Sequence, residues 1–461
     1  MLSPTVVDPV AHRVPLDAFA IAAYTVAFAL VAGLTARRPA YGIAALVAFV
    51  PFAFAHDVGP TTLSLSKVAL GGAVAGLLLR RSGLSVLRDR AAATFLVCGV
   101  FVIAATALSM WHALYRGAAL RETLKSVEYL VLFATVAVAA RADADERPVR
   151  VVLAASVAAV SLLALRQEFT GAPSGLWFMN HVVPRIAGPL EGPNQLAGYL
   201  GIALPLVTAF ICTRRRANLE IGVLAVGCAT LVLTISRAGV VASLGAIVLC
   251  VVLAPPSTRN VVAKPLALAL GAGCAAGGAF LAFWGYAAAH SLGAFTLFGR
   301  FWTMAEAPNP GAVGTRSELW RAAWILWRQH PFFGIGAGNF EFELPLAGYP
   351  QLRTHANSLY VQSLVEGGVP LFLATLALVG ASIARFARGP FREPFVLGAF
   401  SASVGFAAHQ LFDLLVFYPK VGELWWIVLA LGAARSDALA PVVAASRRSI
   451  AVSSRSAAVT Q

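Results

Sequence analysis

The sequence predicts an all-α polytopic membrane protein with 12–13 transmembrane helices and one long loop. Of its 461 residues, 59% are hydrophobic and only 12% are charged, and the mean hydropathy is +0.77. A soluble domain carries about 25% charged residues, so this composition excludes a soluble fold, and the ample apolar surface excludes a disordered chain. At about 20 residues per membrane-spanning helix, the length accommodates about a dozen spans.

The apolar stretches follow one another at the spacing of membrane-spanning helices. The first lacks a small-residue cleavage site, so we expect a retained span rather than a signal peptide. The chain ends before this run and after Asp437 have the composition of disordered segments. Thirteen apolar runs begin near Leu16, Ala40, Thr62, Ala91, Lys125, Val149, Gln195, Leu219, Ala238, Pro265, Val369, Pro394 and Val421.

The net charge of +14 follows the expected topology. Short basic clusters occupy every second loop, and such loops face the cytoplasm. Most of the positive charge is therefore explained by orientation in the membrane, and a nucleic-acid partner is excluded. The clusters are Arg37/Arg38, Arg80/Arg81/Arg88/Arg90, Arg141/Arg147/Arg150, Arg214/Arg215/Arg216, Arg259/Lys264, Arg385/Arg388/Arg392 and Arg435/Arg447/Arg448/Arg455.

One outward loop, from about His290 to Glu366, is far longer than the others, and long loops usually carry function. Thr315 and Glu318 have capping-box spacing, which predicts Arg316 as the first residue of a short helix. Helix N-termini bind phosphate, so Arg316 is a candidate anion ligand. Trp320, Trp324 and Trp327 form an aromatic face, and Arg321 and Arg328 share another; these two arginines either bind the ligand or snorkel from an interfacial helix.

Further along this loop, His355, Gln362 and Glu366 fall on one stripe if the segment is helical. A polar stripe that enters an apolar span is costly unless it lines a cavity. The imidazole of His355 could take a proton from an acceptor hydroxyl, with activity falling below about pH 6; the alternative is a structural histidine.

Two more arginines stand near the outer ends of spans. Arg185 precedes a Gly/Pro-rich stretch, and Arg237 is the charge between two apolar runs. Four arginines converging on one cavity suit a diphosphate, because guanidinium groups pair with phosphate oxygens. For Arg237 the alternative is a snorkelling residue in a turn.

Other signals point to no chemistry. Asp143-Ala144-Asp145 has metal-site spacing but lies among charges, which favours a solvated loop. The five cysteines lie unpaired inside apolar runs, so neither a disulfide framework nor a zinc site is indicated. Apart from Lys67, the spans are expected to be nearly uncharged, which disfavours a transporter.

Taken together, these motifs resemble the O-antigen ligase/polymerase family. The resemblance rests on Arg316 with its tryptophans, His330-Pro331-Phe332-Phe333-Gly334-Ile335-Gly336-Ala337-Gly338-Asn339-Phe340, His355-Ala356-Asn357-Ser358, Glu366-Gly367-Gly368-Val369-Pro370, Ser236-Arg237-Ala238-Gly239 and Gly188 with Pro193-Asn194-Gln195-Leu196-Ala197. It covers about residues 180–385, and one departure is Ala356, inserted where many members have His-Asn-Ser.

The resemblance implies a GT-C-like inverting glycosyltransferase of the inner membrane whose active site faces the periplasm. Its donor would be a glycan on a polyprenyl diphosphate such as undecaprenyl diphosphate, and its acceptor lipid A–core. His355 would be the catalytic base. Arg185, Arg237 and Arg316, with Arg321 as a fourth candidate, would bind the diphosphate, and Gln362 and Glu366 would support the site. Neither a metal nor a cofactor is implied.

Three alternatives remain: a polymerase of O-antigen or exopolysaccharide, a protein O-glycosyltransferase, and, from another class, a polyprenyl-glycan transporter. We expect N-terminal transmembrane helices over 1–179, a ligase-like core over 180–385 with the loop at about 290–366, C-terminal transmembrane helices over 386–436 and a cytoplasmic tail over 437–461.

Overall fold

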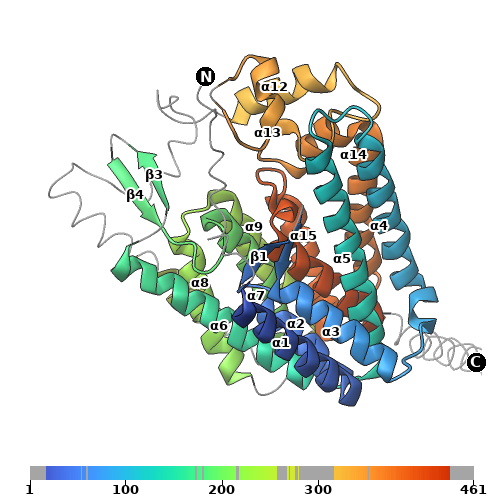
Figure 1. Cartoon of the computed structure of the whole chain (residues 1–461). Helices are drawn as coiled ribbons and strands as arrows, with labels where there is room; N and C mark the ends of the chain where they lie inside the picture. The colour runs from blue at the N-terminus through green and yellow to red at the C-terminus, as the bar shows by residue number, and fades with distance from the viewer. Residues whose placement is uncertain are drawn as a thin grey trace, which may run out of the picture.

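The computed structural model describes residues 17–436, apart from 53, 59–60, 172–173, 179–180, 214–216, 257–266, 269, 276–278, 280–315 and 351. Within these residues the chain is a bundle of apolar helices (Figure 1). In this described part of the chain, six helices are long and apolar enough to cross a membrane, and five more are apolar but shorter. The predicted all-α multi-pass membrane protein is therefore confirmed.

The helices and strands follow in chain order. The first half holds α1 (Ala18–Arg37), α2 (Pro39–Phe49), β1 (Ala55–Val58), β2 (Thr61–Ser64), α3 (Leu65–Leu79), η1 (Ser85–Arg88), α4 (Arg90–Ser109), α5 (Arg116–Ala142), α6 (Arg147–Thr170), β3 (Ser174–Phe178), β4 (His181–Arg185) and α7 (Pro193–Thr213). The second holds α8 (Asn218–Leu233), α9 (Arg237–Leu253), α12 (Arg316–Trp327), α13 (Phe340–Glu343), η3 (Leu344–Ala347), α14 (Leu359–Ala387), α15 (Pro394–His409), η4 (Leu415–Phe417) and a last helix over 419–436.

Most of the predicted apolar runs coincide with a helix, and local signals explain where these helices begin. Asp17 and Ser64 cap α1 and α3 by accepting hydrogen bonds from backbone N–H groups of the first turn. Proline occupies the first position of α2 and α15, where its missing N–H has no helical partner to lose. The run expected from Pro265 lies largely outside the described residues.

The fifth helix differs from the prediction. It begins at Arg116 rather than near Lys125, so Glu122, Lys125 and Glu128 lie inside it. The expectation of nearly uncharged spans was wrong, because hydropathy alone cannot show that such charges are paired. Lys67 of α3 is 3.0 Å from Glu128, and Lys125 is 2.7 Å from Glu122.

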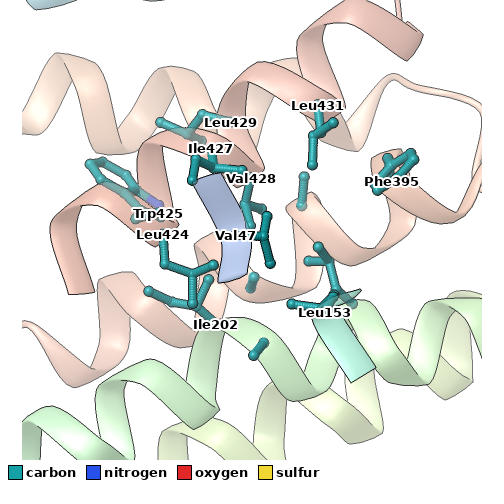
Figure 2. Packing of buried hydrophobic residues seen from close by; sticks show 14 of the residues in the cluster. Val47, Leu153, Ile202, Phe395, Leu424, Trp425, Ile427, Val428, Leu429 and Leu431 are labelled. Carbon is teal, nitrogen blue, oxygen red and sulfur yellow. The ribbon is translucent and has the colours of Figure 1, made fainter. Parts of the chain in front are cut away.

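The core of the bundle is centred on α7, which is buried along almost its whole length. It packs against α15, α9, α8 and α6. Figure 2 shows Leu424, Trp425 and Val428 of the last helix in the same hydrophobic cluster as Ile202 of α7. Helices from both halves of the chain thus close around a helix with almost no lipid-facing surface.

Two small antiparallel hairpins, β1–β2 and β3–β4, interrupt the helices, and the sequence analysis did not predict them. β4 ends at Arg185, and the chain then runs through residues 186–192 into α7. Gln167 of α6 holds this stretch: its Oε1 accepts from the backbone N–H groups of Ala187 and Gly188, both at 2.9 Å. The hairpin therefore delivers Arg185 to the bundle at a fixed place.

One end of the bundle is covered by α12, α13 and η3, and we call it the capped end (Figure 1). A separate hydrophobic cluster holds the cap together, with Leu319 and Leu326 of α12 packed on Phe340 and Val365. Short helices in the long loop were predicted, and α12 and α13 confirm them over its described residues.

Two glycines join this cap to α14. Gly368 has φ +63° and breaks the helix into two parts, and Gly334 has φ +69°. A Cβ at Gly334 would overlap the carbonyl of Glu366, and one at Gly368 would overlap that of Phe332. The turn and the kink therefore fit only because both positions lack a side chain.

The signals set aside in the sequence also have structural roles. Asp143 and Asp145 both face Arg38, at 3.6 Å and 2.9 Å, so this pair joins two loops. All five cysteines are free thiols, three buried and two partly buried.

Candidate active site

The segment between α15 and the last helix, residues 410–418, organises the capped end; we call it the connecting segment. Most of its anchors are backbone carbonyls. Tyr129 of α5 donates its hydroxyl to the carbonyl of Val416 at 3.0 Å. The N–H of Leu359, which opens α14, lies 3.0 Å from two carbonyls, those of Gln410 and Asp413. Helices distant in sequence therefore meet on this segment.

Arg316 lies at one side of the connecting segment. It is the first residue of α12, as predicted, whereas Thr315, the expected capping partner, lies outside the described residues. Its Nε and Nη2 donate to the carbonyl of Phe412 at 3.3 Å and 3.1 Å. The side chain remains exposed, so its guanidinium is accessible to an anionic ligand.

Arg237 is the first residue of α9 and lies beside Arg316, close enough for the two positive charges to repel each other. The turn before it places Ile235 at φ +53°. Two guanidinium groups held together in this way favour an anion between them, because each pairs with phosphate oxygens.

Arg185 is fixed between this turn and α7. Its Nε donates to the carbonyl of Thr234 at 2.8 Å, and its Nη2 donates to Oδ1 of Asn194 at 2.8 Å. The Asn194 side chain also bonds the carboxyl group of Asp413. The sequence motif around Asn194 thus positions an arginine.

Asp413 lies at the centre of these groups and was not recognised from the sequence. It is 5% exposed, interacts with Arg316 and Arg185, and accepts from the N–H of Leu414 at 2.9 Å. Burial raises the pKa of this carboxyl to about 6, although both arginines act in the opposite direction. Its carboxylate orients the arginines without cancelling their combined charge.

His409 is a second residue that sequence reasoning missed. Its side chain is 2% exposed, and its Nε2 lies 3.9 Å from Oδ2 of Asp413. The signal was present in the sequence: a histidine and an aspartate four residues apart directly after an apolar run.

The structure brings Arg185, Arg237 and Arg316 together but not Arg321. That residue is exposed and lies five positions after Arg316, about 140° further round α12. We therefore place three of the four candidate arginines in one site, which we call the arginine cluster.

His355 lies at the other side of the connecting segment. Its partly buried imidazole is 4.1 Å from the ring of Phe417, centroid to centroid, and meets Tyr418 edge-on at 6.4 Å. Burial, and then the positive charge of Lys125, lower the pKa of His355 to about 4. The imidazole is therefore neutral at physiological pH and able to accept a proton.

The predicted helical stripe was partly wrong. α14 begins at Leu359, so His355 precedes the helix and only Gln362 and Glu366 share a face. Asn357, with φ +50°, turns the chain between them. The prediction failed because the polar residues after His355 form a cap, in which Ser358 accepts from the N–H of Val361.

Gln362 and Glu366 nevertheless support the His355 segment. Oε1 of Gln362 accepts from the N–H of Ala356 at 2.7 Å, and its Nε2 donates to Glu366 at 2.7 Å. Glu366 also accepts from the N–H of Phe340 at 3.1 Å. A cavity of about 110 Å³ lies beside these side chains, and Glu122 and Lys125 line it as well.

The helix α12 links the two sides. Trp320 lies one turn after Arg316 and donates its Nε1 to the carbonyl of Ala356 at 2.9 Å. Because Ala356 follows His355 directly, one helix fixes both a candidate anion ligand and the backbone beside the candidate base. The arrangement can hold an anion and remove a proton at neighbouring positions.

Comparison with known proteins finds a similar family over part of the chain. Residues 222–376 match a family model described as O-antigen ligase. No curated protein matches the chain. The matched segment includes Arg237, Arg316 and His355, whereas Arg185, His409 and Asp413 lie outside it. The resemblance seen in the sequence is therefore confirmed, and over residues 222–376 this membrane protein is similar to the O-antigen ligase family.

Proposed function

We propose that this protein is a glycosyltransferase of the cell inner membrane. It transfers a glycan from a polyprenyl diphosphate to a sugar hydroxyl of an acceptor, for which lipid A–core is the leading candidate. The site faces the periplasm, and the reaction is inverting and needs neither metal nor cofactor.

One observation carries this proposal: the arginine cluster and His355 lie on two sides of the same connecting segment. Arg316 bonds the carbonyl of Phe412, and the imidazole of His355 packs on Phe417. A diphosphate carries its charge beside the bond that must break, and the nucleophile must lose its proton near that bond. A site for this reaction therefore needs cationic side chains and a base close together in space.

The chemistry follows from these positions. The acceptor hydroxyl oxygen attacks the anomeric carbon from the face opposite the diphosphate. The bond between that carbon and the diphosphate oxygen breaks, and its electron pair leaves with the diphosphate. His355 takes the hydroxyl proton, while Arg185, Arg237 and Arg316 stabilise the charge that grows on the leaving group.

The decisive experiment is His355→Ala in cells and with purified protein. A general base contributes about 10²–10⁴-fold, so transfer should fall by that factor while donor binding and protein level stay unchanged. His330→Ala is the matched control, because His330 lies in the same cap and stacks on His112 rather than on the connecting segment. Transfer that survives His355→Ala contradicts the mechanism.

The product that accumulates in the His355→Ala cells distinguishes the related reactions. Long glycan on the carrier, with none on lipid A–core, identifies a ligase. Single repeat units on the carrier identify a polymerase, and loss of glycan from proteins identifies a protein O-glycosyltransferase. A transporter needs no base, so transport in the His355→Ala variant favours that class.

Reporter fusions test the location of the site. Fusions after Arg81 and Arg388 should report cytoplasm, because they follow basic clusters. A fusion at Gly348, in the cap, should report periplasm. A cytoplasmic signal at Gly348 would place the site on the wrong side for the proposed acceptor.

A further inference from the structure

Phe417 lies between two groups that come from distant parts of the chain. The His355 imidazole packs on its ring at 4.1 Å, and Nζ of Lys125 lies 4.4 Å from the centroid of the same ring. Nζ of Lys125 also donates to the carbonyl of Phe417 at 2.9 Å. Lys125 therefore fixes both the backbone and the ring that support the imidazole.

The charge of Lys125 is balanced locally by Glu122, one turn earlier in α5. The two side chains are joined by contacts of 2.8 Å and 2.7 Å, and both are largely buried, at 15% and 23% exposure. Glu122 also packs against Gly338 of the cap and interacts with Glu366. Loss of either member of the pair would leave the other as an uncompensated charge beside the histidine.

The other elements packed around His355 contribute titratable groups too. Lys125 acts on the imidazole directly and disfavours its protonation, after burial itself. The groups to consider are Lys125 and Glu122 on α5, Glu366 on α14, Arg316 on α12, Glu341 and Arg353 in the cap, and Asp413 and Tyr418 on the connecting segment.

We propose that Lys125 is a positioning residue for His355: it holds the backbone and ring of Phe417 against the imidazole and, paired with Glu122, sets the local charge beside it. This inference rests on the proposed role of His355 as the base. It gives α5, which lies outside the family match, a part in the reaction.

The test is the pH dependence of transfer by purified protein in four variants. Lys125→Met removes a positive charge and leaves the carboxylate of Glu122 without this ion-pair partner. The acid limb of the pH–rate profile, where transfer falls at low pH, should therefore move to higher pH by about one unit. Glu122→Gln leaves Lys125 uncompensated and should move the acid limb to lower pH. Lys125→Arg keeps the charge and should leave the limb in place. Arg121→Met is the control, because it removes a positive charge from an exposed position of the same helix.

Shifts of the acid limb in opposite directions in Lys125→Met and Glu122→Gln would indicate an effect on the charge beside His355. Structural damage would instead lower activity without moving the acid limb. A Lys125→Met enzyme whose acid limb coincides with that of the wild type overturns the inference, as do shifts of the same sign in both variants. If Lys125→Met does not fold, Glu122→Gln and Lys125→Arg decide the question. Normal transfer by His355→Ala would instead refute the proposed function, so the two failures are distinguishable.

Discussion

The two sides of the connecting segment use charge in opposite ways. On one side the guanidinium groups of Arg185 and Arg316 interact with the carboxylate of Asp413, and the guanidinium group of Arg237 lies beside that of Arg316. On the other side Lys125 is matched by Glu122, and the histidine beside them is neutral. Net positive charge suits a site that binds an anion, whereas a balanced pair suits a site that must hold an uncharged base.

The largest expected effect comes from removing arginines of the arginine cluster. Arg316→Ala and Arg237→Ala should each lower transfer more than tenfold, because a hydrogen bond to a charged group contributes about 1.5–3 kcal/mol. The loss should appear in donor use while the protein still accumulates in the membrane. Lysine at either position should restore activity only partly, because it lacks the guanidinium fork.

Arg321→Ala provides the matched control for this experiment. It removes the same side chain from the same helix as Arg316→Ala, but from an exposed position about 140° away. Activity close to wild type is expected. An equal loss in Arg321→Ala and Arg316→Ala would mean that the cluster does not define the binding site.

The second prediction tests the His355 side of the connecting segment through the pH dependence of transfer. An imidazole with a pKa of about 4 is largely neutral above about pH 5, so transfer should be nearly constant from about pH 8 to pH 5 and fall as the pH approaches 4. An unperturbed histidine would lose activity below about pH 6. The measurement is kcat/KM between pH 4 and 8, with recovery at pH 7.5 as a check on folding; a midpoint near 6.5 would contradict the buried environment.

The smallest expected effect concerns the hydrogen bonds of Gln362, which support the segment that carries His355. Gln362→Ala leaves the N–H of Ala356 and one oxygen of Glu366 without this partner, which should cost about 1–3 kcal/mol of unfolding free energy. We expect a lower unfolding midpoint and a reduced kcat with donor KM unchanged. Gln329→Ala, an exposed change in the same cap, should alter neither. A donor KM that rises in Gln362→Ala would place this residue in the binding site instead.

Hydropathy located most of the helices, because a membrane span must be apolar over its whole length. It placed the start of α5 too late, since Glu122 and Lys125 lower the local hydropathy and their pairing cannot be read from the chain. The two hairpins were missed because each strand has only four or five residues. The sides of the membrane, the domain limits and the tail after 437 stay predictions.

The site was predictable where a local signal existed. Capping spacing identified Arg316 as a first helical residue, and a turn between two apolar runs identified Arg237. His355 was recognised, but its relation to Gln362 was not, because a side chain reaching back six residues to a backbone N–H follows no helical period. Asp413 became visible only when α7, α12 and β4 were placed around it.

The carbonyl anchors of the connecting segment have a consequence for variation among related sequences. Arg316, Tyr129 and Lys125 bond the backbone oxygens of Phe412, Val416 and Phe417, and every amino acid supplies such an oxygen. Substitution at Phe412 or Val416 therefore changes the side-chain surface of the segment without removing an anchor. The segment combines a fixed backbone path with replaceable side chains, so related sequences can differ at these side chains while Arg316, Tyr129 and Lys125 keep their places.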